Sequence, residues 1–87
     1  MAVKYSNIFT AIDGNGHEPV TILVKSIKPR DRETLVVIRT LEGEYETQEE
    51  FKDAAHSQLR SSITLMLPDT HQLVDILNEA LAASGEG

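Results

Sequence analysis

Residues 20–41 read VTILVKSIKPRDRETLVVIRTL, and this stretch decides the fold. Two runs rich in β-branched residues, 20–27 and 34–41, flank a charged connection that contains Pro29. β-Branched side chains fit a pleated, half-buried surface, and a proline among polar residues is typical of a turn. The stretch therefore predicts two adjacent β-strands that are joined by residues 28–33.

The sequence on either side predicts two more strands. Residues 3–12 mix apolar and polar side chains, and the turn sequence DGNG at 13–16 separates them from the strand that Pro19 opens. Glycine and asparagine tolerate the positive φ that a tight hairpin requires. Residues 63–67, ITLML, are expected to form the last strand, which Pro68 ends.

Two segments have the period of amphipathic helices. Thr47 and Glu50 match a capping box, and the thin apolar stripe after them predicts a helix at 48–60 on the edge of the fold. Asp69 is a good N-cap for a second helix at 70–83, which has a full apolar face. The first stripe consists of Phe51, Ala54, Ala55 and Leu59, and the second of Leu73, Ile76, Leu77, Ala80 and Leu81.

The predicted element order is ββ-β-α-β-α. It describes an α+β fold in which a four-stranded antiparallel sheet is packed by the long C-terminal amphipathic helix. A chain of this length forms one domain, expected at residues 1–84, with a flexible tail at 85–87. Both faces of the two central strands are apolar. Either the two helices cover the two faces, or the C-terminal helix covers one and a partner covers the other.

A homodimer is expected from the same pattern. A short chain with two apolar strand faces carries more apolar surface than one good helix can cover, and association supplies the missing burial. We expect the exposed strand face, or the helix at 73–81, to be shared between two chains.

Composition narrows the classes of protein. The 87 residues are 40% hydrophobic and 25% charged, as in an ordinary soluble domain, and they include no cysteine. Disulfides and thiolate metal sites are therefore excluded. No apolar run approaches the roughly 20 residues of a membrane helix, and residues 1–12 lack a secretory pattern. We expect a cytoplasmic protein with no membrane partner.

Catalytic and metal-binding patterns are not found in the sequence. His17, His56 and His71 form no pair at helical spacing, so a zinc site is not expected. The chain has no nucleophile elbow, Walker loop or dinucleotide-binding glycine motif. These observations predict a binding protein that is not an enzyme and uses no cofactor or metal.

Basic residues concentrate in the central stretch. Residues 25–39 carry five basic and two acidic side chains, a local balance of +3 in a chain of net charge −6. A local patch of positive charge indicates the kind of partner that the protein binds. The candidate contacts for single-stranded nucleic acid are Lys25, Lys28, Arg30, Arg32 and Arg39. The alternative is a solvated hairpin whose arginines pair with Asp31 and Glu33.

Acidic residues concentrate directly after this patch. Residues 42–53 carry six acids and one base, Lys52. An acidic surface can steer onto a basic protein or imitate phosphate, so a protein-interaction or inhibitor function is the alternative to nucleic-acid binding. The acids concerned are Glu42, Glu44, Glu46, Glu49, Glu50 and Asp53. Lys52 and Arg60 belong to this acidic side and are expected to contribute little to nucleic-acid binding.

The strand LVVIR at 35–39, the strand ITL at 63–65 and the helix at 72–81 resemble a known family. It is the transcriptional-coactivator family of single-strand DNA-binding proteins, to which the plant Whirly proteins are structurally related. The resemblance covers about two-thirds of the chain. It implies dimerisation through the helix and last strands, with unpaired bases held by basic and aromatic residues of a curved sheet. The helix at 48–60 would be an insertion, and the chain has no tryptophan to stack a base.

Overall fold

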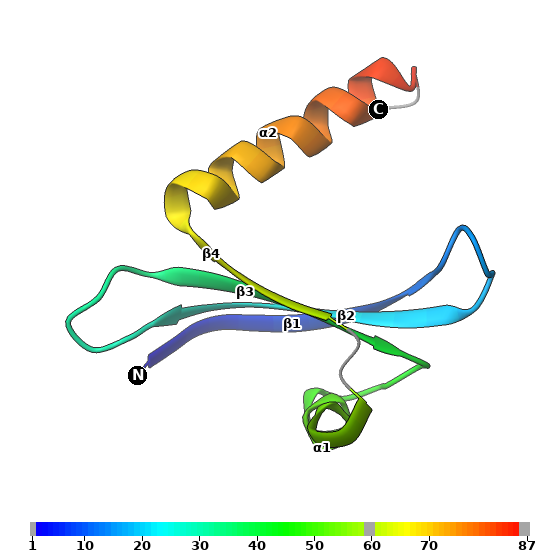
Figure 1. Cartoon of the computed structure of the whole chain (residues 1–87), viewed down its shortest axis with the longest axis horizontal. Coiled ribbons are helices and arrows are strands. Elements are labelled where there is room, and N and C mark those ends of the chain that lie inside the picture. Colours follow the sequence, from blue (N-terminus) through cyan, green and yellow to red (C-terminus); the bar gives the residue numbers. More distant parts are fainter. Residues whose placement is uncertain (1, 59–60, 86–87) are drawn as a thin grey trace.

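The computed structural model describes residues 2–58 and 61–85, which form a curved four-stranded sheet and two helices (Figure 1). The sheet order is β1-β2-β3-β4, and every pairing is antiparallel. This confirms the predicted α+β fold. In chain order the elements are β1 (Ala2–Ile12), β2 (Pro19–Lys28), β3 (Leu35–Glu42), α1 (Gln48–Gln58), β4 (Ser61–Met66) and α2 (Leu67–Ala83).

The two helices lie on opposite sides of the sheet (Figure 1). Leu23 on β2 is opposite Arg39 on β3, and Val24 is opposite Ile38, so the register assigns alternate residues to two faces. We call the side that packs against α1 the α1 face, and the other side the α2 face. Side chains of the α1 face include Leu23, Lys25, Arg39 and Leu41, and those of the α2 face include Phe9, Ile22, Val24, Ile38 and Ile63.

The best-buried part of the described structure lies between α1 and the sheet. Phe51 of α1 is only 1% exposed and packs with Leu23 and Leu41. Tyr45 meets the ring of Phe51 edge-on, with centroids 6.2 Å apart. The expectation that this helix lies on the edge of the fold is therefore wrong. Its alanines are small enough to let the helix pack closely, and Phe51 is the one buried side chain among those described in this helix.

The two helices begin in different ways. At α1, Glu50 N–H donates to Thr47 Oγ1 at 3.1 Å, as the capping box predicts, and Glu46 N–H donates to the Glu50 carboxylate at 3.2 Å. At α2, Met66 is the N-cap and no side chain caps the helix, so the predicted role of Asp69 is wrong. Pro68 in the first turn has no N–H to satisfy and a preset φ, so β4 passes into α2 without a separate cap.

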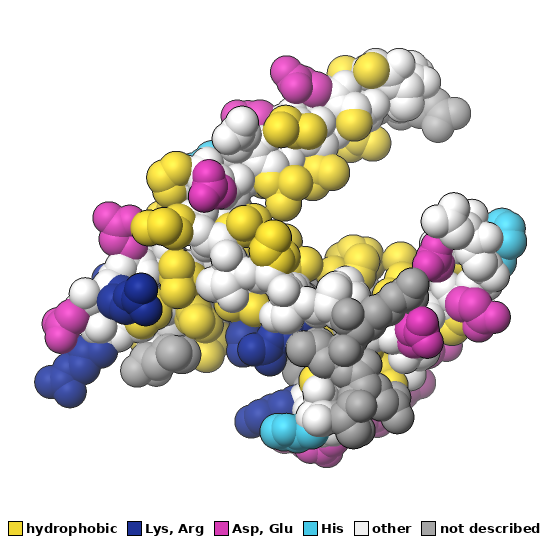
Figure 2. Space-filling view, viewed as in Figure 1, with side chains coloured by type: hydrophobic (Ala, Val, Ile, Leu, Met, Phe, Trp, Pro, Cys, Tyr) yellow, Lys and Arg dark blue, Asp and Glu magenta, His cyan; other side chains and the backbone are white. Residues whose placement is uncertain are grey.

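Helix α2 contacts β3 and β4, but none of its residues is buried. Leu77 is 55% exposed, and Phe9 on the α2 face of the sheet is 56% exposed. Figure 2 shows hydrophobic side chains on α2 and on the sheet beneath it, with open space between them. The helices thus lie over different faces, but α2 does not cover its face, so the alternative in which the two helices cover both faces holds for α1 alone.

Candidate functional site

A groove of about 470 Å³ lies on the α1 face, between α1 and the sheet. Leu23 and Phe51 line it with apolar surface, and polar and charged side chains from β1, β2, β3 and α1 surround them. Because Phe51 anchors the helix to the sheet, the shape of the groove depends on the hydrophobic core itself.

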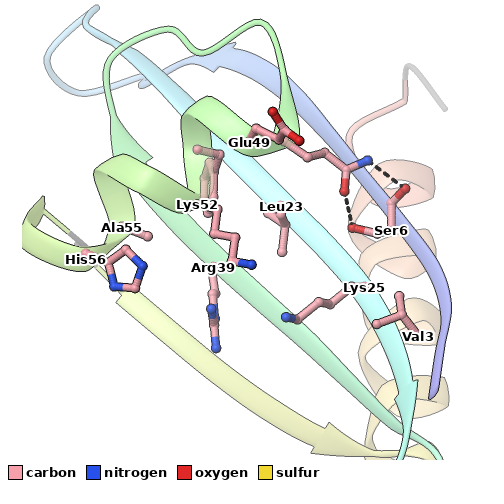
Figure 3. Close-up of a pocket in the computed structure, with 11 residues that line it drawn as sticks. Val3, Ser6, Leu23, Lys25, Arg39, Glu49, Lys52, Ala55 and His56 are labelled. Carbon is pink, nitrogen blue, oxygen red and sulfur yellow. Dashed lines mark hydrogen bonds between the residues drawn. The ribbon is translucent and has the colours of Figure 1, made fainter. Parts of the chain in front are cut away.

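Three cationic side chains converge in this groove (Figure 3). Lys25 on β2 and Arg39 on β3 are diagonal neighbours on one face, because Leu23 is the residue opposite Arg39. Lys52 extends toward them from α1. His56 follows Lys52 by four residues on the same helix and also lines the groove.

The electrostatics of the groove favour an anion. The pKa of Lys25 is lowered, first by burial and then by the like charges of Arg39 and Lys52. The Nε of Arg39 is buried and has no hydrogen-bond partner within the described structure. A buried donor without an acceptor is unfavourable, and so are crowded like charges. An anion placed among the three side chains would relieve the crowding of like charges.

The side of the groove toward β1 is bordered by contacts between α1 and β1. Gln48 Nε2 donates to the carbonyl oxygen of Ser6 at 3.1 Å, and Ser6 Oγ donates to Gln48 Oε1 at 2.5 Å. Glu49 also lines this part, and its carboxylate points away from the three cations (Figure 3). The groove is therefore cationic near Lys25 and acidic near the beginning of α1.

The structure divides the five predicted basic contacts into two groups. Lys25 and Arg39 lie in the groove, whereas the others lie at the end of β2 and in the β2–β3 connection, at one end of the sheet. We call the second group, Lys28, Arg30 and Arg32, the basic loop. All three side chains are exposed, and Lys28 Nζ donates to the backbone carbonyl of Arg32.

Sequence reasoning missed two residues of the groove. It assigned Lys52 to the acidic side, but the structure places Lys52 beside Lys25 and Arg39, and it adds His56. The available signal was the position of Lys52 directly after Phe51, the one aromatic side chain of the helical stripe. Arg60, which was grouped with Lys52, lies outside the described residues.

The six acids of residues 42–53 are all exposed. They are spread over the end of β3, the connection to α1 and the first two turns of α1. Glu50 accepts a hydrogen bond from Glu46 N–H just before α1, and Glu49 borders the groove.

Other kinds of site receive no support from the described residues. Among them, no group of three or more His, Asp or Glu side chains is placed to hold a metal ion. None of the helices described is long and apolar enough to cross a membrane. The chain matches no family model, no curated protein and no solved structure.

Lys25→Met is expected to raise the free energy of unfolding at pH 7 by a few tenths of a kcal/mol, because solvent screens most of the repulsion at this partly exposed site. The pKa of Lys25 is lower in the folded chain than its usual 10.5, so the unfolded chain binds the proton more tightly. This unfavourable contribution is fully present below the folded pKa and disappears as pH rises through 10.5.

Urea unfolding of both proteins at pH 7 and pH 11 measures this difference, with Lys28→Met as a matched control in the basic loop. The stability gain of Lys25→Met over the wild type should shrink at the higher pH. An equal gain at both pH values would contradict the proposed crowding of charge.

Proposed function

We propose that this protein is a non-enzymatic, dimeric domain that binds single-stranded nucleic acid across its α1 face. The observation that carries the proposal is the convergence of Lys25, Arg39 and Lys52 in an open groove where the Arg39 Nε lacks an acceptor. Phosphate oxygens are strong acceptors for charged donors. The resemblance to single-strand DNA-binding coactivators points the same way.

The basic loop extends this cationic surface. Lys28 ends β2 about 10 Å along the strand from Lys25, and strand alternation places its side chain on the α2 face; Arg30 and Arg32 follow it in the connection to β3. A backbone that leaves the groove in this direction would meet the side chains of Arg30 and Arg32 next. The groove and the loop together therefore supply cations to several successive phosphates.

A single strand suits this surface better than a duplex. Helix α1 forms a wall beside the sheet, and a flexible strand can follow the space between them, whereas a duplex is stiff. The exposed aromatic residues Tyr5 and Phe9 lie on the α2 face, away from the groove. Binding through the groove would therefore depend on phosphate contacts more than on stacked bases, and it would weaken steeply with salt.

Titration of a labelled single-stranded oligonucleotide, followed by fluorescence anisotropy, tests the proposal. With four or five phosphate contacts, the log–log slope of affinity against salt should be about −3. Arg39→Gln and Lys52→Gln should each lower affinity by about tenfold, since each removes a charge-assisted hydrogen bond. The double variant Arg30→Gln, Arg32→Gln should reduce both affinity and slope.

Lys4→Gln on β1 is the matched control, because it removes one exposed positive charge outside the groove and the basic loop. It should leave affinity nearly unchanged. If Lys4→Gln weakened binding as much as Arg39→Gln, the groove would not be the binding site.

A second copy of the chain is the proposed cover of the α2 face. The chain exposes 6503 Å², whereas a compact monomer of 9.6 kDa exposes about 5,100 Å². Its radius of gyration is 14.4 Å, against about 12 Å expected for its length. The surplus of about 1,400 Å² exceeds the roughly 800 Å² that each partner contributes to a standard interface.

The exposed apolar side chains are placed for a reciprocal contact. Ile76, Leu77 and Leu81 on α2 and Phe9 and Ile63 on the sheet are each more than half exposed. In a two-fold dimer, α2 of each copy would lie over the α2 face of the partner, so that helix and sheet surfaces cover each other twice. The α1 face and its groove would stay open on both copies.

The alternative, a protein partner bound through the acidic surface of residues 42–53, is supported by the exposure of all six acids. This alternative predicts that the labelled oligonucleotide does not bind in the titration described above. If the oligonucleotide fails to bind at 50 mM salt while a lysine-rich peptide binds, the acidic surface becomes the better candidate.

A further inference from the structure

We infer that the groove recognises a phosphate monoester, a group with two ionisable oxygens, at the point where Lys25, Arg39 and Lys52 converge. The inference rests on the proposed function and deepens it, because it makes a phosphorylated strand end the part of the nucleic acid that this site selects.

The first argument is charge density. Each phosphodiester of a strand carries one negative charge, and contacts to it are spaced along the backbone. Here three cations from β2, β3 and α1 meet at one place, where Lys25 is already partly desolvated. A phosphate monoester carries about −1.5 to −2 charges at pH 7 and three strong acceptor oxygens. It therefore matches three converging donors better than a diester does.

The second argument is the unsatisfied donor. The Nε of Arg39 is buried and has no hydrogen-bond partner among the described residues, so no protein acceptor holds the guanidinium at that atom. A guanidinium can bind two oxygens of one phosphate side by side. The ammonium groups of Lys25 and Lys52 approach the same place and would contact the remaining oxygen.

The third argument is that the groove favours one direction of exit. Toward β1, where Ser6 is opposite Lys25, it is bordered by the hydrogen bonds between Ser6 and Gln48, and Glu49 adds a negative charge at the beginning of α1. A strand that continued in this direction would bring its next phosphate toward that carboxylate. Along β2 the chain leads past Ile27 to the connection that carries Arg30 and Arg32. A site with one favourable exit fits the end of a strand better than its middle.

The experiment compares three single-stranded oligonucleotides of one sequence, labelled internally, with a 5′-phosphate, a 3′-phosphate or hydroxyl groups at both ends. One phosphorylated form should bind about tenfold more tightly than the hydroxyl form at the same salt concentration. Arg39→Gln and Lys52→Gln should each remove this preference. The double variant Arg30→Gln, Arg32→Gln should weaken all three oligonucleotides together and keep the preference.

The outcomes separate this inference from the proposed function. If all three oligonucleotides bind equally well, the end-recognition inference is overturned and the proposed function stands. If no oligonucleotide binds, nucleic-acid binding is overturned, and titration with inorganic phosphate or a mononucleotide then decides the inference. NMR shifts at Lys25 and Arg39 that are lost in Lys52→Gln would support a phosphate monoester site, and their absence would overturn it.

Folding of the variants is checked separately. Lys52 is exposed on α1, so Lys52→Gln should keep the circular dichroism spectrum and the unfolding midpoint of the wild type. Because Lys52→Gln should be well folded, the inference stays testable even if Arg39→Gln proves unstable.

Discussion

Replacing Leu77 with aspartate is expected to convert the proposed dimer into a monomer across the micromolar range. Leu77 lies within the apolar stripe of α2 and is 55% exposed in the single chain. In the proposed dimer it would be buried against the partner's sheet, and aspartate would place an unpaired carboxylate there. Burying an unpaired charge is strongly unfavourable, and a two-fold interface contains the change twice.

The size of this effect can be bounded. A loss of only about 2 kcal/mol at each of the two positions amounts to about 4 kcal/mol per dimer, which raises the dissociation constant by about a thousandfold. Sedimentation at micromolar concentration should give a mass of about 19 kDa for the wild type, twice the 9.6 kDa of one chain, and the single-chain mass for Leu77→Asp.

Asn78→Asp is the matched control, because it adds the same charge at the neighbouring position, outside the apolar stripe. The control should remain a dimer. A wild-type protein that sediments as a monomer at all concentrations, or a Leu77→Asp variant that stays dimeric, would show that α2 has some other role.

The second large effect is expected at Phe51. Phe51→Ala should lower the free energy of unfolding by about 3–5 kcal/mol, since it removes the largest fully buried side chain of the described structure and leaves a cavity. The total stability of a domain is only about 5–15 kcal/mol, so the variant should be close to unfolding. Urea denaturation followed by circular dichroism measures the change.

Two other variants make this test specific. Phe51→Leu keeps much of the apolar volume and should cost clearly less, whereas His56→Ala changes an exposed side chain of the same helix and should cost little. A loss below about 1 kcal/mol for Phe51→Ala would mean that α1 is not a core element. Phe51→Ala should also weaken oligonucleotide binding, because Lys52 reaches the groove only while α1 stays on the sheet.

The strands could be predicted from sequence because their signals are local. The β-branched runs, Pro19 and the DGNG turn each act on their own segment, and the structure has strands within one or two residues of the expected bounds. One detail of the turn was not visible: His17, not a glycine, takes a positive φ of 57°. The hydrogen bond from His17 N–H to the carbonyl oxygen of Asp13, at 2.7 Å, accompanies that conformation.

The site was only half visible because it is assembled across elements. Lys25 and Arg39 stood out as basic residues on strands, but the contribution of Lys52 depends on how α1 packs. That packing was underestimated because a stripe with two alanines looks weak, while the burial of one phenylalanine decides it. The beginning of α2 was misplaced for a related reason. Asp69 has the right chemistry for a cap, but Pro68 already lies within the first turn.

Strand order in this sheet follows chain order, so each strand pairs with its neighbour in sequence. Such local contacts close short loops and form quickly within one chain, at a rate that does not depend on protein concentration. In the proposed dimer, the cover of the α2 face comes from another molecule, and its arrival is a second-order event. The sheet would then form first, and the α2 face of a newly made chain would stay exposed until a second chain binds. This interval becomes shorter as the concentration of the protein rises.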